Sequence, residues 1–297
     1  MTQHAPLAGI ALALAAVACF ATLDTASRAV TLAGVPVLMG LWVRYLFQAL
    51  FTTLWVLPRR GLANLSTEHP RFHLLRGVLL FFSSLCAFFG LKYLPVGEFT
   101  AIVMITPLVV TLASAWRSHQ PVGLVRWLLV TGGFMGTLVI ARPGTGHFGW
   151  PVVFPLALIG VNTGFQLLTS RMSATEDPML MQCTTGWVGT ILASLALPWA
   201  WTTITAPGLW AGLALMGVAG TVGHWLLTLA FQRASPPTLM PYMYAQIGFA
   251  MLGGLLWFGH VPDGWSLAGM GLIAVCGALG AIRGLLAARR EAPDVAG

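Results

Sequence analysis

Ten apolar runs, each about as long as a lipid bilayer is thick, fill most of this 297-residue chain. A helix needs about 20 consecutive apolar residues to cross a bilayer. A spanning segment must satisfy its own backbone polar groups, because the bilayer core holds no water, and a single apolar run does so as a helix. The sequence therefore predicts an all-α integral membrane protein with ten transmembrane helices. The predicted spans are 7–27, 34–57, 74–94, 97–116, 124–142, 151–171, 179–199, 207–231, 237–258 and 264–286.

The composition excludes a soluble fold. Hydrophobic residues make up 57% of the chain and charged residues 8%, against about 25% charged residues in ordinary soluble domains. Met1 to His4 hold no Lys or Arg, so the first run is interpreted as a retained span rather than a secretory signal. The cysteines stand singly inside predicted spans, so we expect no disulfide, no metal site and no cofactor. They are Cys19, Cys86, Cys183 and Cys276.

Short motifs recur in the same order in the two halves of the chain. Pro36-Val37-Leu38-Met39 returns 142 residues later as Pro178-Met179-Leu180-Met181. Four such collinear matches predict a duplicated unit, and repeated halves are how many carriers build a substrate site at the bilayer midplane. The other three pairs are Ser27-Arg28 with Ser170-Arg171, Leu75, Gly77 and Val78 with Leu215, Gly217 and Val218, and Trp127, Leu129 and Gly133 with Trp265, Leu267 and Gly271.

Each predicted repeat has an odd number of spans. Residues 1–143 and 147–288 hold five spans each, residues 289–297 form a short cytoplasmic tail, and Pro and Gly between Arg142 and Gly146 permit a turn. A five-span unit enters the membrane on one side and leaves on the other, so its second copy must be inverted. Two inverted repeats can exchange shapes and open a central site to either side, which is the basis of alternating access.

The net charge of +7 follows the orientation of the spans rather than a nucleic-acid site. Cytoplasmic loops of membrane proteins accumulate Lys and Arg. With the N-terminus inside, most basic residues fall at inner segments, so we expect both termini in the cytoplasm and a multi-pass protein of the plasma (inner) membrane. The inner residues are Arg59, Arg60, Arg71, Arg76, Arg117, Arg126, Arg171, Arg233, Arg283, Arg289 and Arg290; the outer ones are Arg28, Lys92 and Arg142; Arg44 lies in a span.

Four stretches point to a known family. They are Arg233 to Tyr244 (RASPPTLMPYMY), Leu256 to Asp263 (LWFGHVPD), Leu94 to Ile102 (LPVGEFTAI) and Thr106-Pro107-Leu108. With the ten spans, and with Asp24, Arg28 and Arg44 in the first two, they resemble the EamA branch of the drug/metabolite transporter superfamily over nearly the whole chain. The resemblance implies a carrier that moves small organic solutes, often outward, through a central cavity formed by both halves.

Two positions depart from the family's pattern. The family commonly carries an acidic residue after helix four and another after helix nine, and here these positions are Gln120 and His260. The joint loss of both acids indicates structural end-caps or gates on one side, rather than an indispensable proton site.

Ionisable residues in the first half are candidates for the site. Such a group at mid-span costs about 2.5–3.5 kcal/mol on insertion scales, so it should face a cavity or a partner. Asp24 and Arg28 share a helix face and either pair structurally or meet substrate. Arg44 neutralises Asp24 or Glu98, meets an anionic substrate group, or pairs structurally. Glu98 either caps the N-terminus of the fourth span or, if partly buried, carries a proton.

The second half supplies polar residues in place of charges. His224-Trp225 lies centrally in the eighth span, aligned with Ser84 of the first half, and the histidine is either a packing residue or part of the site. Pro241 removes a backbone donor from the ninth span and loosens it. The predicted cavity residues are Asp24, Arg44, Ser84, Glu98, Asn162, Gln166, His224, Trp225, Tyr242, Tyr244 and Gln246.

Motif searches favour a carrier over other classes of membrane protein. The chain has no GxSxG, HExxH or Walker motif, so we expect no enzyme. The sequence predicts a secondary-active exporter or exchanger of amino-acid-like or related small metabolites, working by alternating access. The alternatives are a passive channel or facilitator and a non-transport membrane scaffold. Protons as a coupling ion, and a monomer or a homodimer, are left open; nucleic acid is not expected as a partner.

Overall fold

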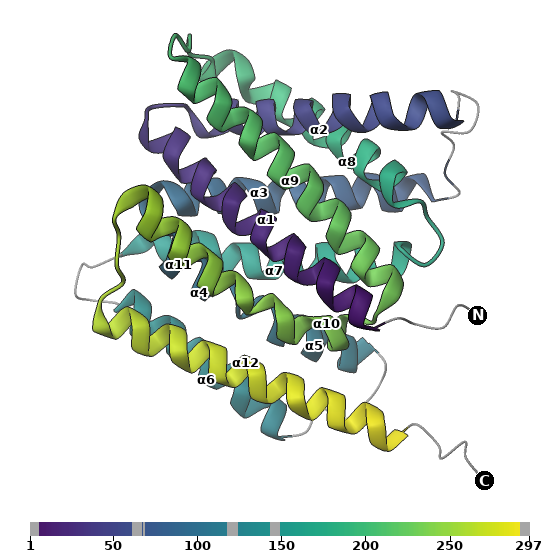
Figure 1. The fold of residues 1–297 in the computed structure, drawn as a ribbon, viewed down its shortest axis with the longest axis vertical. Helices are drawn as coiled ribbons and strands as arrows, with labels where there is room; N and C mark the ends of the chain where they lie inside the picture. The colour runs from purple at the N-terminus through teal and green to yellow at the C-terminus, as the bar shows by residue number, and fades with distance from the viewer. Residues whose placement is uncertain (1–5, 61–66, 68, 118–123, 143–148, 292–297) are drawn as a thin grey trace.

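The structure of the chain, a computed structural model, describes residues 6–60, 67, 69–117, 124–142 and 149–291. Within these ranges the chain is all-helical, with no strand (Figure 1). The elements are α1 (Pro6–Leu32), α2 (Val37–Arg60), α3 (Pro70–Tyr93), α4 (Val96–Val103), α5 (Thr106–Arg117), α6 (Leu124–Ala141), the 3-10 helix η2 (Trp150–Val152), α7 (Val153–Met172), α8 (Pro178–Ala200), α9 (Pro207–Arg233), α10 (Pro236–Met243), α11 (Ala245–Phe258) and α12 (Gly264–Glu291).

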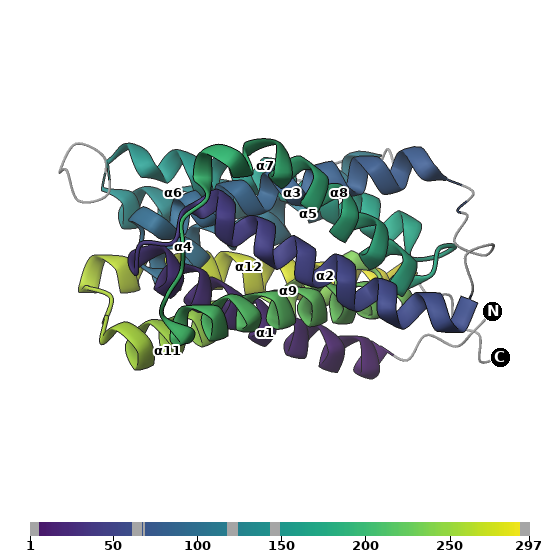
Figure 2. The same ribbon diagram turned by 90° about the horizontal axis from the view of Figure 1, so that it is seen from above.

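The helices lie side by side along one direction (Figure 2). The start of α1 and the end of α12 lie at the same end of the bundle (Figure 1), here called the terminal end. Helices α3 and α8 also begin there, whereas α4 and α12 begin at the other end, here called the distal end.

Helix boundaries follow local chemistry. Asp177 caps α8 by accepting a hydrogen bond from the Leu180 backbone N–H at 2.9 Å, and Pro178 follows it in the first turn, where a missing N–H costs nothing. Asp263 caps α12 in the same way, through Ser266 N–H at 2.9 Å. Helix α11 ends at Gly259, whose φ of 62° lies in the left-handed region that favours glycine.

Seven helices are long and apolar enough to cross a membrane, among the described residues. They cover Leu7–Leu32, Val37–Pro58, Pro70–Tyr93, Trp150–Met172, Pro178–Ala200, Pro207–Arg233 and Thr238–Phe258. Three shorter apolar helices, Val96–Val110, Trp127–Ile140 and Gly264–Gly280, lie at the other three predicted spans. Large apolar side chains point outward along the bundle, as expected of a surface that faces lipid; the most exposed include Leu54, Trp116, Trp199 and Leu256.

Two of the predicted spans are interrupted. The fourth is divided into α4 and α5 at Met104, and the ninth into α10 and α11 at Tyr244. Pro107 explains the first break, because a proline gives no hydrogen bond to the carbonyl four residues earlier and its ring crowds that carbonyl, here at Val103. The two breaks are 140 residues apart.

The main helix pairs join the two halves of the chain. Helix α1 packs against α9, α2 against α8, α3 against α7, and α6 against α12. Around these, α3 also contacts α8 and α2 contacts α9, while α1 contacts α11 and α7 contacts α5. Helix α4 contacts α11, and α5 contacts α10. Each of the three large hydrophobic clusters therefore draws side chains from both halves.

Parts of the sequence-based predictions lie outside the described residues. The predicted joint from Arg142 to Gly146 is one of these, apart from Arg142, whose φ is 45°. Gln120 is another. At the other end of the second half, α12 continues to Glu291, so the predicted tail begins as helix.

Candidate functional site

A cavity lies at the centre of the bundle, walled by α1, α2, α3, α4, α7, α9, α10 and α11. Its volume is about 100 Å³, which is room for a few water molecules. Seven of the residues predicted from the sequence line it, from both halves of the chain. They are Asp24, Arg44, Ser84, Asn162, Gln166, His224 and Gln246.

Arg44 enters the cavity from α2 and is almost fully buried. Its Nη1 donates to Ser84 Oγ on α3 at 2.5 Å, and its guanidinium lies 4.9 Å from the ring of Tyr45. The Tyr45 hydroxyl shares a 2.9 Å hydrogen bond with the same Ser84 Oγ. A side chain at Gly220 would come within 2.8 Å of Arg44 Nε, so this glycine makes room for the guanidinium.

Asp24 lies in the cavity wall and accepts a hydrogen bond from Gln246 Nε2 at 3.3 Å. It forms no ion pair with Arg28, the partner considered from the sequence. Arg28 instead donates to the backbone carbonyls of Leu91 and Leu94, where α3 ends, and lies over the ring of Phe258. Arg28 therefore ties helices together away from the cavity, and Asp24 remains available to it.

His224 lies between two aromatic rings. The ring of Phe20 is 4.8 Å away, centroid to centroid, and that of Phe165 is 5.6 Å away in an edge-on arrangement. No hydrogen bond to either His224 ring nitrogen is present within the described ranges. This is not a histidine whose polar atoms are satisfied by packing, since its Nδ1 is buried without a partner in the cavity wall.

Three cavity residues carry buried polar atoms that no described group satisfies: Arg44 Nε, Gln166 Oε1 and His224 Nδ1. A buried polar atom without a hydrogen bond costs about 1–3 kcal/mol. Native structures satisfy most such atoms, so these three mark positions where a bound solute or water supplies the missing partner. The cavity can thus offer a donor and an acceptor, together with a histidine that serves as either.

Four of the predicted residues do not line the cavity. Tyr244 lies against α12, where a side chain at Gly277 would collide with its ring. Trp225 and Tyr242 are half-buried at other faces of their helices. Glu98 is buried at the start of α4, where its Oε1 is 2.9 Å from Nε2 of His260.

Glu98 of the first half contacts His260 of the second half. Its side chain caps no backbone N–H of α4. The second carboxylate oxygen, Oε2, is buried without a partner. Nearby, Arg142 Nη2 lies 2.7 Å from Asp263 Oδ2, so this ion pair and the Glu98–His260 contact join the halves at the distal end.

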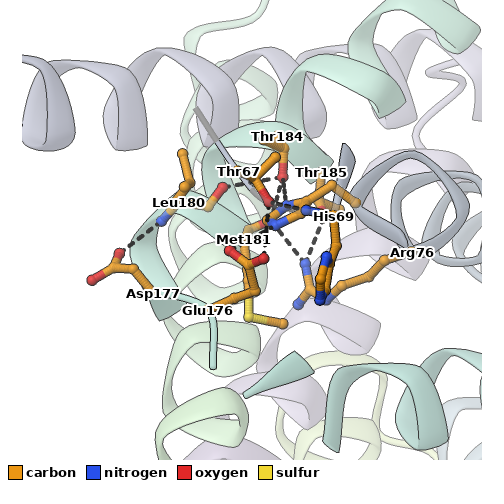
Figure 3. A network of polar contacts seen from close by, with 10 residues as sticks. Thr67, His69, Arg76, Glu176, Asp177, Leu180, Met181, Thr184 and Thr185 are labelled. Carbon is orange, nitrogen blue, oxygen red and sulfur yellow. Dashed lines mark hydrogen bonds and ion pairs between the residues drawn. The ribbon is translucent and has the colours of Figure 1, made fainter. Parts of the chain in front are cut away.

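A second polar network, missed from the sequence, centres on Arg76 (Figure 3). Arg76 was expected at an inner segment, but the structure buries it completely in α3. Its Nε donates to Thr169 at 3.0 Å, and its Nη1 to the Met181 carbonyl at 2.8 Å and to Thr185 at 2.5 Å. Its guanidinium lies 5.0 Å from the ring of Phe165. The signal was present, because Arg76 falls inside the predicted span 74–94.

The same network continues to the terminal end. His73 Nε2 lies 3.3 Å from Glu176 Oε2, and His73 Nδ1 lies 2.8 Å from Thr184 Oγ1. Thr67 donates to the other oxygen of Glu176 at 2.9 Å (Figure 3). These contacts join the start of α3 to the loop between α7 and α8, and therefore the first half to the second.

The site offers no obvious metal ligands. In the ranges that the structure describes, no three His, Cys, Asp or Glu side chains gather closely enough to hold a metal ion. The four cysteines are free thiols.

An all-helical fold with an apolar outer surface and a buried polar cavity defines an integral membrane protein of the transporter class. The model of the EamA-like transporter family matches residues 7–142. A riboflavin transporter of Rhizobium johnstonii is 30% identical over 234 residues, covering 77% of this chain and 76% of its own length. An S-adenosylmethionine uptake transporter of Rickettsia prowazekii is 26% identical, covering 73% of this chain and 74% of its own length. The chain belongs to the EamA-like transporter family within the drug/metabolite transporter superfamily.

A solved crystal structure shares the fold. It superposes with a TM-score of 0.67 at 18% identity and covers 95% of this chain and 98% of its own. The family and the named relatives support membrane transport of small metabolites as the activity of this chain.

Proposed function

We propose that this protein is a secondary-active transporter that moves small organic metabolites by alternating access. In this proposal ten spans form two inverted five-helix repeats, 1–143 and 147–288, and α4 with α5 and α10 with α11 are each one broken span. The substrate site is the central cavity between the repeats.

The helix contacts support an inverted repeat. If each span of the first half is exchanged for its equivalent in the second, α1 becomes α7 and α9 becomes α3. The pair α1 with α9 then becomes α7 with α3, which is observed, and α2 with α8 and α6 with α12 map onto themselves. The exchange also converts the contact between α3 and α8 into the contact between α9 and α2. It converts the contact between α4 and α11 into the contact between α10 and α5. All four contacts are observed.

The broken helices support the same relation. Met104 and Tyr244, where the breaks fall, are 140 residues apart, within the spacing of the repeated motifs. Broken helices near the midplane are a common device by which carriers expose backbone groups to a substrate. Here the break at Met104 borders the cavity, since Val103 and Met104 line it.

The ties at the two ends support two exchangeable states. His73–Glu176 closes the terminal end, and Glu98–His260 with Arg142–Asp263 closes the distal end. Every one of these contacts joins the first half to the second. Breaking one set while the other holds would open the cavity to one side at a time.

The single observation that carries the proposal is the cluster of unpaired polar atoms on Arg44, Gln166 and His224 around one central cavity. A volume of about 100 Å³ is below the 300–1,000 Å³ typical of small-molecule pockets. In this proposal the structure is a closed conformation, and binding a metabolite requires one end to open.

We further propose that both termini are cytoplasmic in the plasma (inner) membrane and that transport is export or exchange. Riboflavin and S-adenosylmethionine enter the panel of test solutes because the relatives carry these names. Proton coupling and a monomer or homodimer remain open within this proposal.

Counterflow into liposomes tests the proposal. Purified protein is reconstituted, the liposomes are loaded with one unlabelled metabolite, and entry of the same labelled metabolite is followed. A carrier gives saturable uptake that the internal metabolite accelerates, because the loaded site returns faster than the empty one. Flux that rises linearly with concentration and ignores the internal metabolite would instead identify a channel. Absence of flux for a broad panel would identify a scaffold.

A further inference from the structure

The buried charges of the bundle balance in number, two arginines and two carboxylates, but not in position. Among the described residues, four side chains of Asp, Glu, Lys or Arg are buried: Asp24, Arg44, Arg76 and Glu98. Glu98 has its own partner in His260 at the distal end. The region around the cavity therefore combines two guanidinium groups with one carboxylate. Buried charges are normally paired, since an uncompensated one is costly.

Arg44 forms no direct ion pair among the residues that the structure describes. Asp24 lines the same cavity, but it accepts a hydrogen bond from Gln246 and forms no ion pair with Arg44. Arg44 Nη1 donates to the neutral hydroxyl of Ser84, and its buried Nε has no partner among the described groups. A guanidinium with a free N–H in a cavity wall is suited to a carboxylate or phosphate group.

Arg76 also forms no direct ion pair among the described residues, and it lies closer to the terminal end than Arg44 does. Its hydrogen-bond partners are two threonine hydroxyls and a backbone carbonyl, all neutral, and its buried Nη2 has no partner. No carboxylate lies within ion-pair distance of it in the part of the chain that the structure describes.

Phe165 lies between the two positions. It lines the cavity and meets His224 edge-on, while the Arg76 guanidinium lies over its ring. Phe165 is therefore the side chain that separates Arg76 from the cavity.

We propose that the substrate carries an anionic group, a carboxylate or a phosphate, which Arg44 binds in the central cavity and Arg76 binds next on the terminal side of Phe165. The proposal rests on the transport function proposed above and specifies its substrate class. An anionic group compensates the excess positive charge and occupies the free guanidinium N–H groups. A neutral solute leaves both arginines uncompensated, and a cation without an anionic group adds to the excess.

Binding is tested with matched pairs of compounds that differ in one anionic group. The pairs are nicotinate with nicotinamide, flavin mononucleotide with riboflavin, and tryptophan with tryptophanamide, each added to the detergent-purified full-length protein. A ligand of the folded state raises the melting temperature, and we expect a larger rise with the anionic member. Equal or larger shifts with the members that lack the anionic group, in all three pairs, would overturn the proposal.

Variants of Arg44 show whether this residue binds the anionic group of the ligand. Arg44→Gln should remove the preference for the anion and lower apparent affinity by about tenfold or more, while Arg44→Lys should keep part of it because the charge remains. Arg71→Gln, at an exposed arginine, is the matched control and should change nothing. An anion preference that survives in Arg44→Gln would contradict the assignment.

Variants of Arg76 separate its role from a structural one. Because Arg76 binds the group after the cavity does, Arg76→Gln should leave the anion-induced melting shift intact and slow counterflow of that anion by about tenfold or more. Thr185→Val removes a hydrogen bond of Arg76 but keeps its charge, and should transport normally. Arg76→Lys keeps the positive charge, and it replaces Arg76→Gln in the counterflow test if the glutamine variant does not fold. Normal counterflow in Arg76→Gln, or slow counterflow in both Arg76→Lys and Thr185→Val, would remove Arg76 from the path.

The two proposals fail in different ways. Saturable exchange of a solute without an anionic group, unaffected by Arg44→Gln, would refute the anionic substrate class and leave the transporter proposal standing. Anion-selective binding without exchange in liposomes would refute transport and leave the anion site standing.

Discussion

Glu98 Oε1 lies 2.9 Å from His260 Nε2, and this contact joins α4 of the first half to the loop between α11 and α12 of the second. Glu98 is 2% exposed and His260 36%, so the pair spans the boundary between the interior and the distal end. The EamA family commonly carries an acid where this chain has His260. An acid there would repel Glu98, whereas a histidine can donate a hydrogen bond to it.

We expect Glu98→Gln to favour opening of the distal end. A hydrogen bond to a charged group is worth about 1.5–3 kcal/mol. Removing the charge of Glu98 should therefore raise the population of the conformation that is open at the distal end by about tenfold. The measurement is the labelling rate of a cysteine placed at Ala87, a cavity residue, by a membrane-impermeant maleimide in a variant without the four native cysteines. Labelling that is unchanged from the distal side would show that this pair is not part of a gate.

Glu176→Gln should have the opposite sidedness. Glu176 accepts from Thr67 and pairs with His73, so removing its charge loosens the terminal end instead. The same cysteine at Ala87 should then be labelled faster from the terminal side and no faster from the distal side. The two glutamine variants serve as controls for each other, and identical sidedness in both would contradict the assignment of separate gates.

The Arg142–Asp263 contact should be insensitive to pH in the neutral range. The backbone N–H of Ser266, its side chain and then Arg142 lower the pKa of Asp263 from 3.8 to about 2. A lowered carboxyl pKa stabilises the folded state above the unfolded value and loses that effect as pH falls from 3.8 towards about 2. The melting-temperature difference between wild type and Asp263→Asn should therefore stay constant above about pH 5 and shrink at lower pH.

A control variant separates the charge of Asp263 from its capping role. Asp263→Asn can still accept the hydrogen bond from Ser266, whereas Asp263→Ala cannot. The alanine variant should thus melt below the asparagine variant at every pH. A difference between wild type and Asp263→Asn that grows steadily between pH 5 and 8 would point to another titrating group.

Gly186→Ala should destabilise the bundle by about 1–3 kcal/mol. A Cβ at this position would lie 2.7 Å from the backbone N of Ala49 and 2.8 Å from its Cα, so α2 and α8 would have to separate. Gly160→Ala is the control, because no atom lies within 4 Å of its added Cβ and alanine favours a helix over glycine. Thermal unfolding in detergent should lower the melting temperature for the first variant and leave or raise it for the second.

His224→Phe should impair transport without loss of stability. Because neither ring nitrogen of His224 has a hydrogen-bond partner in the described structure, its removal leaves no group unsatisfied. Phenylalanine also keeps the aromatic contacts with Phe20 and Phe165. We expect counterflow to fall by about tenfold or more at an unchanged melting temperature. Trp225→Phe, one residue along and off the cavity, should transport normally.

Hydropathy predicts the helices of this fold well, because a bilayer-spanning run needs only local sequence. It does not predict the breaks at Met104 and Tyr244 as breaks, although Pro107 and Pro241 mark the neighbourhood. Gln246 faces the cavity while Tyr244 packs against α12, because residues two apart along a helix point to nearly opposite faces.

The polar cavity is only partly readable from sequence. Asp24, Arg44 and His224 are visible because any ionisable side chain within an apolar run needs a partner or a cavity. Arg76 falls in such a run too, but its neighbours in the chain suggest the membrane surface. Its burial depends on Thr185 and the Met181 carbonyl, more than a hundred residues away, and no local pattern reports contacts of that separation.

The pairing of α1 with α9, α2 with α8, α3 with α7 and α6 with α12 has a consequence for biogenesis. Neither half can complete a hydrophobic cluster by itself, so the halves are interlocked rather than docked. When α1 to α6 have entered the membrane, the faces that later pack against α7 to α12 are still in lipid. The chain can mature only after its last helix has entered the membrane, and a truncated product would remain a substrate for membrane quality control.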